Sequence, residues 1–273
     1  NSSRYIIGVS QSGLGLDPEY YTQPNEQQKA VVAAYKSLKN DYLKMVGNAP
    51  AVAKKKMEEA FALENRIAKV SYDQVKSRDP QANYHPMTWE QLLKDYPGID
   101  WNYILKIAGY PNNGGKVDVG QPEPVHEVEK ILATAPLDQL KAYMELAVIS
   151  SSAGMLSDAF SKRKFEYTKV AYGVQQQQPR WKRALSFVQG IMGEAVGKLY
   201  VQKYFPESSK ERMVQLVKNL QSAFAQRIEE NTWMTAATKA KALEKLQAFD
   251  IKIGYPDKWQ NMDSVFVIDD AKS

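Results

Sequence analysis

The sequence has no cysteine, only two histidines and no long run of apolar residues. Without cysteine, neither a disulfide framework nor a thiolate-ligated metal site can form. The best candidate for a membrane span, residues 146–149, is far shorter than the roughly 20 apolar residues that a bilayer requires. We therefore expect no transmembrane segment. The sequence starts at Asn1 without a charged-then-apolar leader, so we expect that a signal or anchor, if the gene encodes one, has been removed.

The composition is that of an ordinary globular protein. Its 273 residues are 44% hydrophobic and 25% charged, which is enough to build a core without disulfides or metal. The formal charge is +5, but the 36 basic residues are interleaved with 31 acidic ones. Three basic clusters, at residues 54–56, 162–164 and 180–183, all have acids close by, so we interpret them as solvated helix faces. This pattern argues against nucleic-acid binding.

Hydrophobic periodicity predicts a mainly α fold with a few short strands near the termini and in the middle. No linker or repeat divides the chain, so we expect residues 1–273 to form a single helical domain. The predicted strands cover residues 4–10, 117–119 and 265–268. The predicted helices cover residues 25–45, 51–76, 88–96, 137–152, 156–172, 180–204, 208–231 and 235–249, and two more begin near residue 100 and near residue 122.

Glu64 is a carboxylate inside the apolar stripe of the second predicted helix, with Phe61 and Ile67 among its apolar neighbours. A buried carboxylate is rarely tolerated without a partner. We therefore expect an arginine or a hydroxyl donor against Glu64, which is a structural role. A catalytic acid is the alternative interpretation.

His126-Glu127 resembles the start of a zincin motif, in which two histidines one helical turn apart bind zinc and the glutamate acts as base. The second histidine position is occupied by Lys130, whose cationic side chain cannot replace an imidazole on zinc. The other histidine, His85, precedes Pro86 and reads as a turn or surface residue. We therefore predict no metal ligand and no catalytic residue in this chain.

The sequence also offers no other familiar catalytic constellation. Ser150–Ser152 lie at a helix end without a glycine-flanked nucleophile turn or a histidine partner. Gly13-Leu14-Gly15 lacks the third glycine and the following βαβ unit of a dinucleotide site. From the residues alone, the chain is a largely helical domain without a catalytic site.

Seven segments nevertheless form an ordered set of recognisable motifs, at residues 11–21, 62–68, 78–88, 180–183, 193–201, 233–242 and 252–257. In this order they resemble segments of the neprilysin, endothelin-converting enzyme and bacterial PepO family of zinc endopeptidases. The resemblance covers nearly the whole chain, and its most specific parts are Arg180–Arg183 and Gly193–Val201.

The resemblance implies a function for the chain as part of a larger enzyme. In that family a helical domain caps a thermolysin-like catalytic domain, and the two enclose a chamber that admits oligopeptides of modest size. This sequence resembles the cap, so the zinc site would lie in a catalytic domain that these residues do not include. The expected cofactor is zinc in the parent enzyme, and the expected partners are that catalytic domain and oligopeptide substrates. The substrate-contacting residues stay unknown.

One departure from the family pattern concerns the source. Mammalian members carry a cysteine at the position of Ala184, so the resemblance favours a bacterial PepO-like enzyme. Such enzymes are commonly exported and often lipid-anchored, which implies a periplasmic or extracellular location.

Two further expectations follow. In a cap the chain leaves and rejoins the catalytic domain, so Tyr5–Val9 should lie near Val265–Ile268. The alternative function is an autonomous helical binding module that holds a protein or peptide partner on a basic face. A bare apolar patch would favour the cap.

Overall fold

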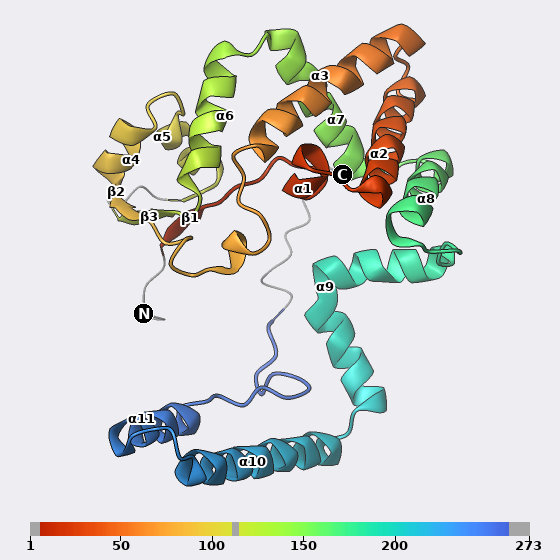
Figure 1. Cartoon of the computed structure of the whole chain (residues 1–273). Coiled ribbons are helices and arrows are strands. Elements are labelled where there is room, and N and C mark those ends of the chain that lie inside the picture. The colour runs from red at the N-terminus through yellow and green to blue at the C-terminus, as the bar shows by residue number, and fades with distance from the viewer. Residues whose placement is uncertain (1–5, 111–114, 262–273) are drawn as a thin grey trace. The chain divides into compact units, whose positions relative to one another are not determined.

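A computed structural model describes residues 6–110 and 115–261 of the chain (Figure 1). The described residues form eleven α-helices and one three-stranded sheet, which confirms the mainly α fold. The chain divides into two compact units, residues 1–177 and 178–273, and we describe each by itself. The expectation that residues 1–273 form a single domain stays a prediction. The expectation that Tyr5–Val9 lie near Val265–Ile268 also stays a prediction, because Tyr5 and the second segment lie outside the described residues.

The first unit contains eight helices, and seven of them were predicted. Helix α1 was missed, because five residues are too few to show a helical period. The elements of the first unit, in chain order, are β1 (Ile7–Val9), α1 (Pro18–Thr22), α2 (Glu26–Met45), α3 (Pro50–Ala68), the 3-10 turn η1 (Lys76–Arg78), β2 (Pro86–Thr88), α4 (Trp89–Asp95), α5 (Trp101–Ile107), β3 (Lys116–Val119), α6 (Pro122–Thr134), α7 (Leu137–Ser152) and α8 (Asp158–Tyr172).

Local sequence explains where the helices begin. The Asn25 side chain accepts a hydrogen bond from the Gln28 N–H, and the Asn25 N–H donates to the Gln28 side chain, so α2 starts with a capping box. Thr88 and Gln91 form the same arrangement at the start of α4. Proline occupies the first turn of α1, α3 and α6, where its missing N–H costs nothing.

The sheet is small and mixed. Its strand order is β1-β3-β2, with β1 parallel to β3 and β2 antiparallel to it. Val117 and Val119 on β3 are buried against Trp89, Leu92 and other side chains of α4 and α5, which forms a local core. The sheet therefore fixes where the chain leaves β1 and runs on toward α1.

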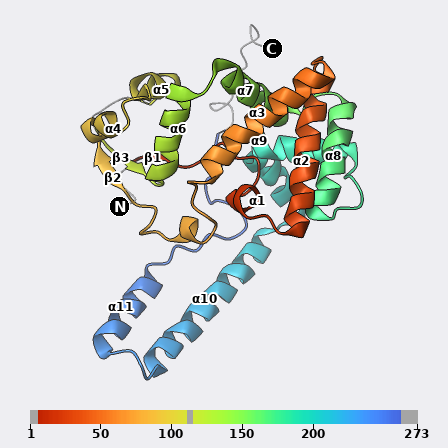
Figure 2. The same cartoon turned by 45° about the horizontal axis from the view of Figure 1, so that its top comes forward.

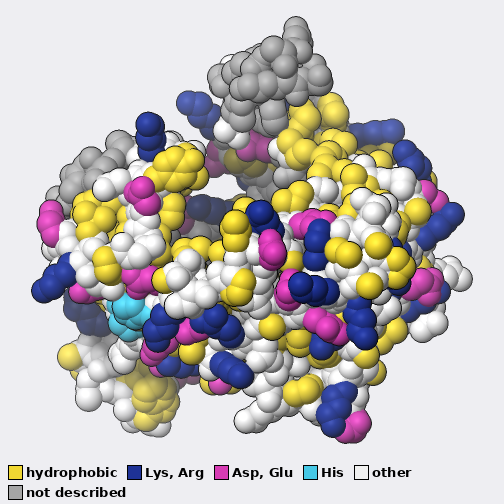
Figure 3. Space-filling view, turned by 90° about the horizontal axis from the view of Figure 1, so that it is seen from above, with side chains coloured by type: hydrophobic (Ala, Val, Ile, Leu, Met, Phe, Trp, Pro, Cys, Tyr) yellow, Lys and Arg dark blue, Asp and Glu magenta, His cyan; other side chains and the backbone are white. Residues whose placement is uncertain are grey.

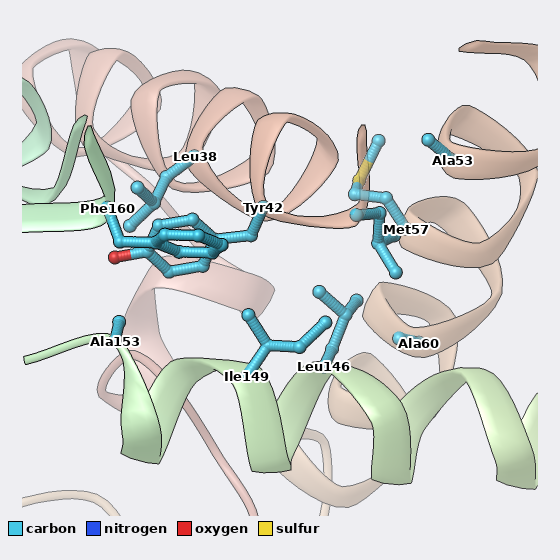
Figure 4. Packing of buried hydrophobic residues seen from close by; sticks show 10 residues of the cluster. Leu38, Tyr42, Ala53, Met57, Ala60, Leu146, Ile149, Ala153 and Phe160 are labelled. Atoms are coloured by element: carbon cyan, nitrogen blue, oxygen red, sulfur yellow. The ribbon is translucent and has the colours of Figure 1, made fainter. Parts of the chain in front are cut away.

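The main core lies between α2, α3, α7 and α8, which pack side by side in Figures 1 and 2. Tyr42 and Leu43 of α2 are almost fully buried there, and the Tyr42 ring lies 5.5 Å from that of Phe160 on α8. Figure 4 shows the rings of Tyr42 and Phe160 facing α7, where Leu146 and Ile149 lie about one turn apart. Full burial of one such apolar side chain stabilises the fold by about 1.5–3 kcal/mol.

The second predicted helix is shorter than expected. We predicted it through residue 76, but α3 ends at Ala68, and Val75 is 79% exposed. The reason is a tertiary contact: the Tyr72 N–H donates to Gln11 Oε1, and Gln11 Nε2 donates to the Tyr72 carbonyl. These bonds replace helical ones, and no sequence period reports them.

The described part of the second unit, residues 178–261, contains three helices, α9 (Arg180–Tyr204), α10 (Glu207–Glu230) and α11 (Ala236–Gln247). Their bounds agree with the predicted helices to within two residues at each end. Helices α10 and α11 pack against each other in both ribbon views (Figures 1 and 2). Helix α9 is bent at Met192, whose backbone angles of −124° and 34° are not helical, and Gly190 and Gly193 flank the bend.

Candidate functional site

The segment that follows β1 is the candidate site with the most unusual surroundings. We call residues 11–16 the glycine loop; it belongs to the first of the family-like segments. The Gln11 side chain brackets the Tyr72 backbone with two hydrogen bonds, and the Gln11 N–H donates to Gln121 Oε1. The loop is therefore fastened at its start to the segment after α3 and to the start of α6.

Two tyrosine hydroxyls fasten the rest of the glycine loop. Tyr143 on α7 donates to the Gly13 carbonyl over 2.8 Å. The N–H groups of Gly15 and Leu16 both donate to the hydroxyl of Tyr21 on α1, each over 3.2 Å. Side chains from two helices thus satisfy backbone groups of the loop.

Glu64 on α3 is the buried partner of this arrangement. Its carboxylate accepts a hydrogen bond from the Tyr21 hydroxyl at 2.9 Å and another from the Tyr35 hydroxyl at 2.8 Å. The Glu64 side chain is buried, so these bonds offset part of its desolvation. The expected hydroxyl partner is confirmed, and with both carboxylate oxygens engaged the contacts are those of a structural residue.

Burial dominates the titration behaviour around Glu64. Desolvation raises the pKa of Glu64 above 4.5, although hydrogen bonds from Tyr35 and Tyr21 and the charge of Lys39 act in the opposite direction. Burial also lowers the pKa of Lys39, whose Nζ donates to Ser150 Oγ over 2.6 Å. Desolvation and the nearby Glu64 carboxylate raise the pKa of both tyrosines. The cluster therefore disfavours charge and favours hydrogen bonding.

The two glycines of the loop are required by close approach. A Cβ at Gly15 would lie 1.9 Å from the Tyr35 hydroxyl, a distance that no side chain tolerates. Gly13 has a φ of +93°, and a Cβ there would lie 2.8 Å from the Tyr143 hydroxyl. The glycine pattern is thus explained by tyrosine packing and not by phosphate binding.

The glycine loop separates two hollows in the first unit. One is a mixed polar and apolar cleft of about 390 Å³ that the loop shares with α1 and the end of α8. The other is an apolar cavity of about 490 Å³ between α3, α5, α6 and α7. Gln11, Ser12 and Gly13 line both, so this stretch of backbone is the wall between them.

The two histidines lie in different surroundings, and neither lies in a cluster of carboxylates in the described residues. His126 stacks on the Tyr96 ring at 4.3 Å, and its Nδ1 lies 3.5 Å from Glu129. Nδ1 of His85 lies 3.1 Å from the Val119 carbonyl oxygen. In residues 6–110 and 115–261 no three His, Cys, Asp or Glu side chains gather in a way that could hold a metal ion. The residues present therefore do not fit a zinc site.

Glu127, the base in the zincin comparison, has a different partner. It accepts two hydrogen bonds from the Arg66 guanidinium, at 3.0 and 2.8 Å, and so joins α6 to α3. The three serines at 150–152 form the last turn of α7, and Ser150 and Ser151 bond back to helix carbonyls. These groups serve the packing of the first unit.

Two of the three basic clusters, residues 54–56 and 162–164, have side chains paired with acids in the described part of the chain. Lys56 lies 2.6 Å from Glu145, and Lys162 lies 2.8 Å from Asp158. Arg163 lies 2.7 Å from Asp41, which holds the pKa of that carboxyl below its usual range against the effect of burial. Side chains of both signs are interspersed over the face shown in Figure 3. We find no continuous basic face here that would favour the binding-module alternative.

The second unit differs from the first in having almost no buried side chain. None of the residues of α9 is buried: Leu185, Val188, Met192 and Leu199 are exposed and Val196 is half-buried. On α10 and α11 only Ile228 and Leu246 are buried. Large apolar side chains more than half exposed on α9 and α10 include Trp181, Phe187, Ile191, Leu199, Leu220 and Phe224. This unit therefore presents a bare apolar surface.

The last described segment is fixed to α10 by aromatic and charged contacts. Lys210 donates to the Tyr255 carbonyl and to Asp257, and it lies 4.3 Å from the centre of the Tyr255 ring. Gly254 has a φ of +71°, and Phe205 packs directly over it. The Gly-Tyr-Pro-Asp segment thus makes a fixed turn, and only the sequence resemblance had singled it out.

No helix in the described residues is long and apolar enough to cross a membrane.

Comparison with known proteins gives one consistent family. Endothelin-converting enzyme-like 1 of Mus musculus is 32% identical over 264 residues, which cover 94% of this chain and 34% of that protein. The neutral endopeptidase of Lactobacillus helveticus is 27% identical over 256 residues, with 94% and 39% coverage. The crystal structure of the zinc metalloprotease Zmp1 of Mycobacterium tuberculosis in complex with an inhibitor matches with a TM-score of 0.86 and 36% identity, over 94% of this chain and 39% of that one.

The chain spans about a third of the length of the curated relatives that it matches. The model of the N-terminal region of peptidase family M13 matches residues 1–256, which is most of the sequence. The chain therefore belongs to peptidase family M13 and represents the N-terminal region of that family.

Proposed function

We propose that this chain is the helical, non-catalytic domain of a zinc metalloendopeptidase that hydrolyses oligopeptides. In this proposal residues 1–273 act as one helical domain that encloses a substrate chamber and limits substrate size. The observation that carries the proposal is the match of residues 1–256 to the N-terminal model of peptidase family M13. The relatives described as endopeptidases and as a zinc metalloprotease support the class of reaction.

The side chains of this chain support a division of labour in the parent enzyme. Zinc activates a water for attack on a peptide bond when three side chains leave it an open position. His85 and His126 are engaged with Val119 and Tyr96, and the described residues contain no ligand cluster. The proposal therefore assigns the zinc ligands to a catalytic domain that lies outside these residues.

The bare apolar surface of α9 and α10 supports the presence of a large partner. Monomeric proteins rarely expose contiguous apolar surface beyond a few hundred Å², and such patches mark interfaces. Trp181, Phe187 and Ile191 are 62%, 53% and 56% exposed on α9, where Phe187 and Ile191 lie about one turn apart. In this proposal the catalytic domain of the same polypeptide is the partner. The helices would then owe much of their stability to that contact.

The first experiment is a peptidase assay on a quenched fluorogenic oligopeptide with added zinc. It compares this chain alone with the full-length product of its gene, each with and without a chelator. We expect activity only in the full-length protein, lost on chelation. Activity in this chain alone would show a site that the structure does not explain, and inactivity of both proteins would refute the peptidase role.

A second experiment tests the limit on substrate size. The full-length enzyme is given a nested series of peptides that share one cleavage sequence, together with the same sequence inside a large unfolded protein. We expect kcat/KM to fall steeply once the substrate exceeds the chamber. Equal cleavage of the short peptide and the unfolded protein would remove the chamber from the proposal.

We also propose that the parent enzyme is bacterial and acts in the periplasm or outside the cell. The absence of cysteine is compatible with this location but does not require it. Fractionation of the source cells with an antibody against this chain tests the proposal. Recovery of the protein in the cytosolic fraction would refute it.

A further inference from the structure

The second half of the glycine loop, Gly15 and Leu16, is held by hydrogen bonds that lead to one buried carboxylate. Gly15 and Leu16 donate to Tyr21, and Tyr21 donates to Glu64. The loop has hollows on both sides, so packing supports it less than an ordinary buried segment. Its position therefore depends on the hydrogen-bonding capacity of the Tyr21 hydroxyl.

That capacity is already full. A phenolic hydroxyl has one hydrogen to donate and two lone pairs to accept with. Tyr21 uses both lone pairs for the Gly15 and Leu16 N–H groups and its hydrogen for Glu64 Oε2. Tyr21 cannot accept a further hydrogen bond, so it must always be the donor toward Glu64.

The second tyrosine is not restricted in this way. Tyr35 donates to Glu64 Oε1, and in the described part of the chain no backbone N–H donates to its hydroxyl. The Tyr21 hydroxyl also lies beside that of Tyr35. Because Tyr21 gives its one hydrogen to Glu64, the Tyr35 hydroxyl can still accept a hydrogen bond from Glu64. If Glu64 binds a proton on Oε1, that O–H can donate to Tyr35, while Oε2 still accepts from Tyr21.

We propose that Tyr21 and Glu64 hold the glycine loop in place whether or not Glu64 carries a proton, because Tyr35 reverses its hydrogen bond when the proton binds. Tyr21 is the positioning residue of the loop, and Tyr35 is the reversible partner. The device keeps the wall between the two hollows fixed across the pH range in which Glu64 titrates. It is independent of the proposed peptidase role.

The other ionisable groups around Glu64 are consistent with a single proton site. Tyr21 belongs to α1, Tyr35 and Lys39 to α2, and Tyr143 to α7; Glu64 itself is on α3. Burial and the Glu64 charge raise the pKa of Tyr143, so like Tyr21 and Tyr35 it stays protonated. Only Glu64 and Lys39 can change charge, and Lys39 hydrogen-bonds Ser150.

The test is amide hydrogen exchange at Gly15 and Leu16 in the full chain, read by NMR and corrected for the intrinsic pH dependence of exchange. The variants are Tyr21→Phe, Tyr35→Phe and Glu64→Gln, each examined on both sides of the Glu64 titration. Circular dichroism and the amides of α2 and α7, which belong to the same unit as Glu64, report whether each variant is folded. Tyr35→Phe is the matched control for Tyr21→Phe, because both remove one hydroxyl from the same carboxylate.

We expect the wild-type amides to keep their protection across the titration. Tyr21→Phe should speed exchange at Gly15 and Leu16 about tenfold or more at every pH, since it removes their acceptor. Glu64→Gln should retain protection, because the Gln oxygen accepts from Tyr21 and its NH₂ donates to Tyr35. Tyr35→Phe should retain protection at neutral pH and lose it at acid pH, where the proton on Glu64 has no acceptor left.

Two results would overturn the proposal. Protection of Gly15 and Leu16 in Tyr21→Phe equal to that of the wild type would remove Tyr21 as the positioning residue. Protection in Tyr35→Phe that is the same on both sides of the titration would remove the reversal. A purely structural role for Tyr35 would give a loss of protection that does not change with pH.

Discussion

The raised pKa of Glu64 predicts how the stability of the first unit changes with pH. Desolvation raises the pKa of Glu64 above its ordinary value of 4.5, so the folded chain holds this proton more tightly than the unfolded chain does. The stabilising contribution is then fully present below pH 4.5 and is lost as the pH rises to the folded pKa. The sign is opposite to that of an ordinary salt-bridged carboxylate.

The perturbation that isolates this effect is Glu64→Gln, which imitates the protonated carboxyl. Between pH 4.5 and the folded pKa, the unfolding free energy of the wild type should fall relative to the variant. The slope is at most about 1.4 kcal/mol per pH unit for one proton. We expect the two proteins to be similar near pH 4 and the variant to be the more stable one at pH 7.

The comparison with Glu64→Gln is needed because other carboxylates change the free energy of unfolding with pH in the opposite direction. A hydrogen bond from Lys56 lowers the pKa of Glu145 against the effect of burial, and hydrogen bonds from Arg163 and Lys44 do the same for Asp41. Their stabilisation is lost as the pH falls. These contributions are common to the wild type and Glu64→Gln, so they cancel in the difference between the two curves.

The assay is urea denaturation at intervals of half a pH unit from pH 4 to 8. Unfolding of the first unit is monitored through hydrogen exchange of the α3 amides, because the two units need not unfold in one transition. Parallel curves for the wild type and Glu64→Gln would refute the desolvation argument. A wild type that gains stability relative to the variant as the pH rises would show that the tyrosine hydrogen bonds outweigh burial.

The remaining predictions concern packing, and urea denaturation measures each. Gly15→Ala should destabilise the chain by about 1–3 kcal/mol or more, because its Cβ would meet the Tyr35 hydroxyl, whereas Gly8→Ala, with open space at its Cβ, is the control and should change little. Leu146→Ala, 3% exposed in the main core, should cost about 2–5 kcal/mol, and a smaller loss would mean that the core collapses around the change. Tyr42→Phe should be neutral or stabilising by up to about 1 kcal/mol, because the buried Tyr42 hydroxyl has no partner in the described residues; a clear loss would reveal a hydrogen bond there.

The sequence predicted the elements of the fold well because their signals are local. The helix at residues 88–96 and the strand at residues 117–119 were both predicted correctly. The end of α3 was wrong by eight residues because Gln11, far away in the sequence, captures the Tyr72 backbone. The helix at residues 180–204 was also predicted correctly, but none of its residues is buried, since apolar spacing predicts a helix and does not identify what covers its apolar face.

The candidate site was predicted only in part, for a similar reason. Glu64 was identified from the conflict between its charge and its apolar neighbours, and a hydroxyl partner was expected. The sequence could not predict that Tyr21 and Tyr35 are the hydrogen-bond partners of Glu64, because they lie 43 and 29 residues away from it. The dependence of Gly15 on Tyr35 is likewise a tertiary contact, although the glycine itself stood out in the resemblance.

The contrast between the two units bears on where a partner of this chain would bind. The first unit buries apolar side chains in three clusters, and several of its polar groups converge on Glu64. The second unit has three glycines on α9, at 190, 193 and 197, with open space where a Cβ would lie. Each glycine in a helix costs about 1 kcal/mol relative to alanine. A surface that packs closely on α9 would explain both that cost and the exposed side chains of Phe187 and Tyr200 on the same helix. We therefore expect the stability of the second unit to depend more on such a partner surface than that of the first unit does.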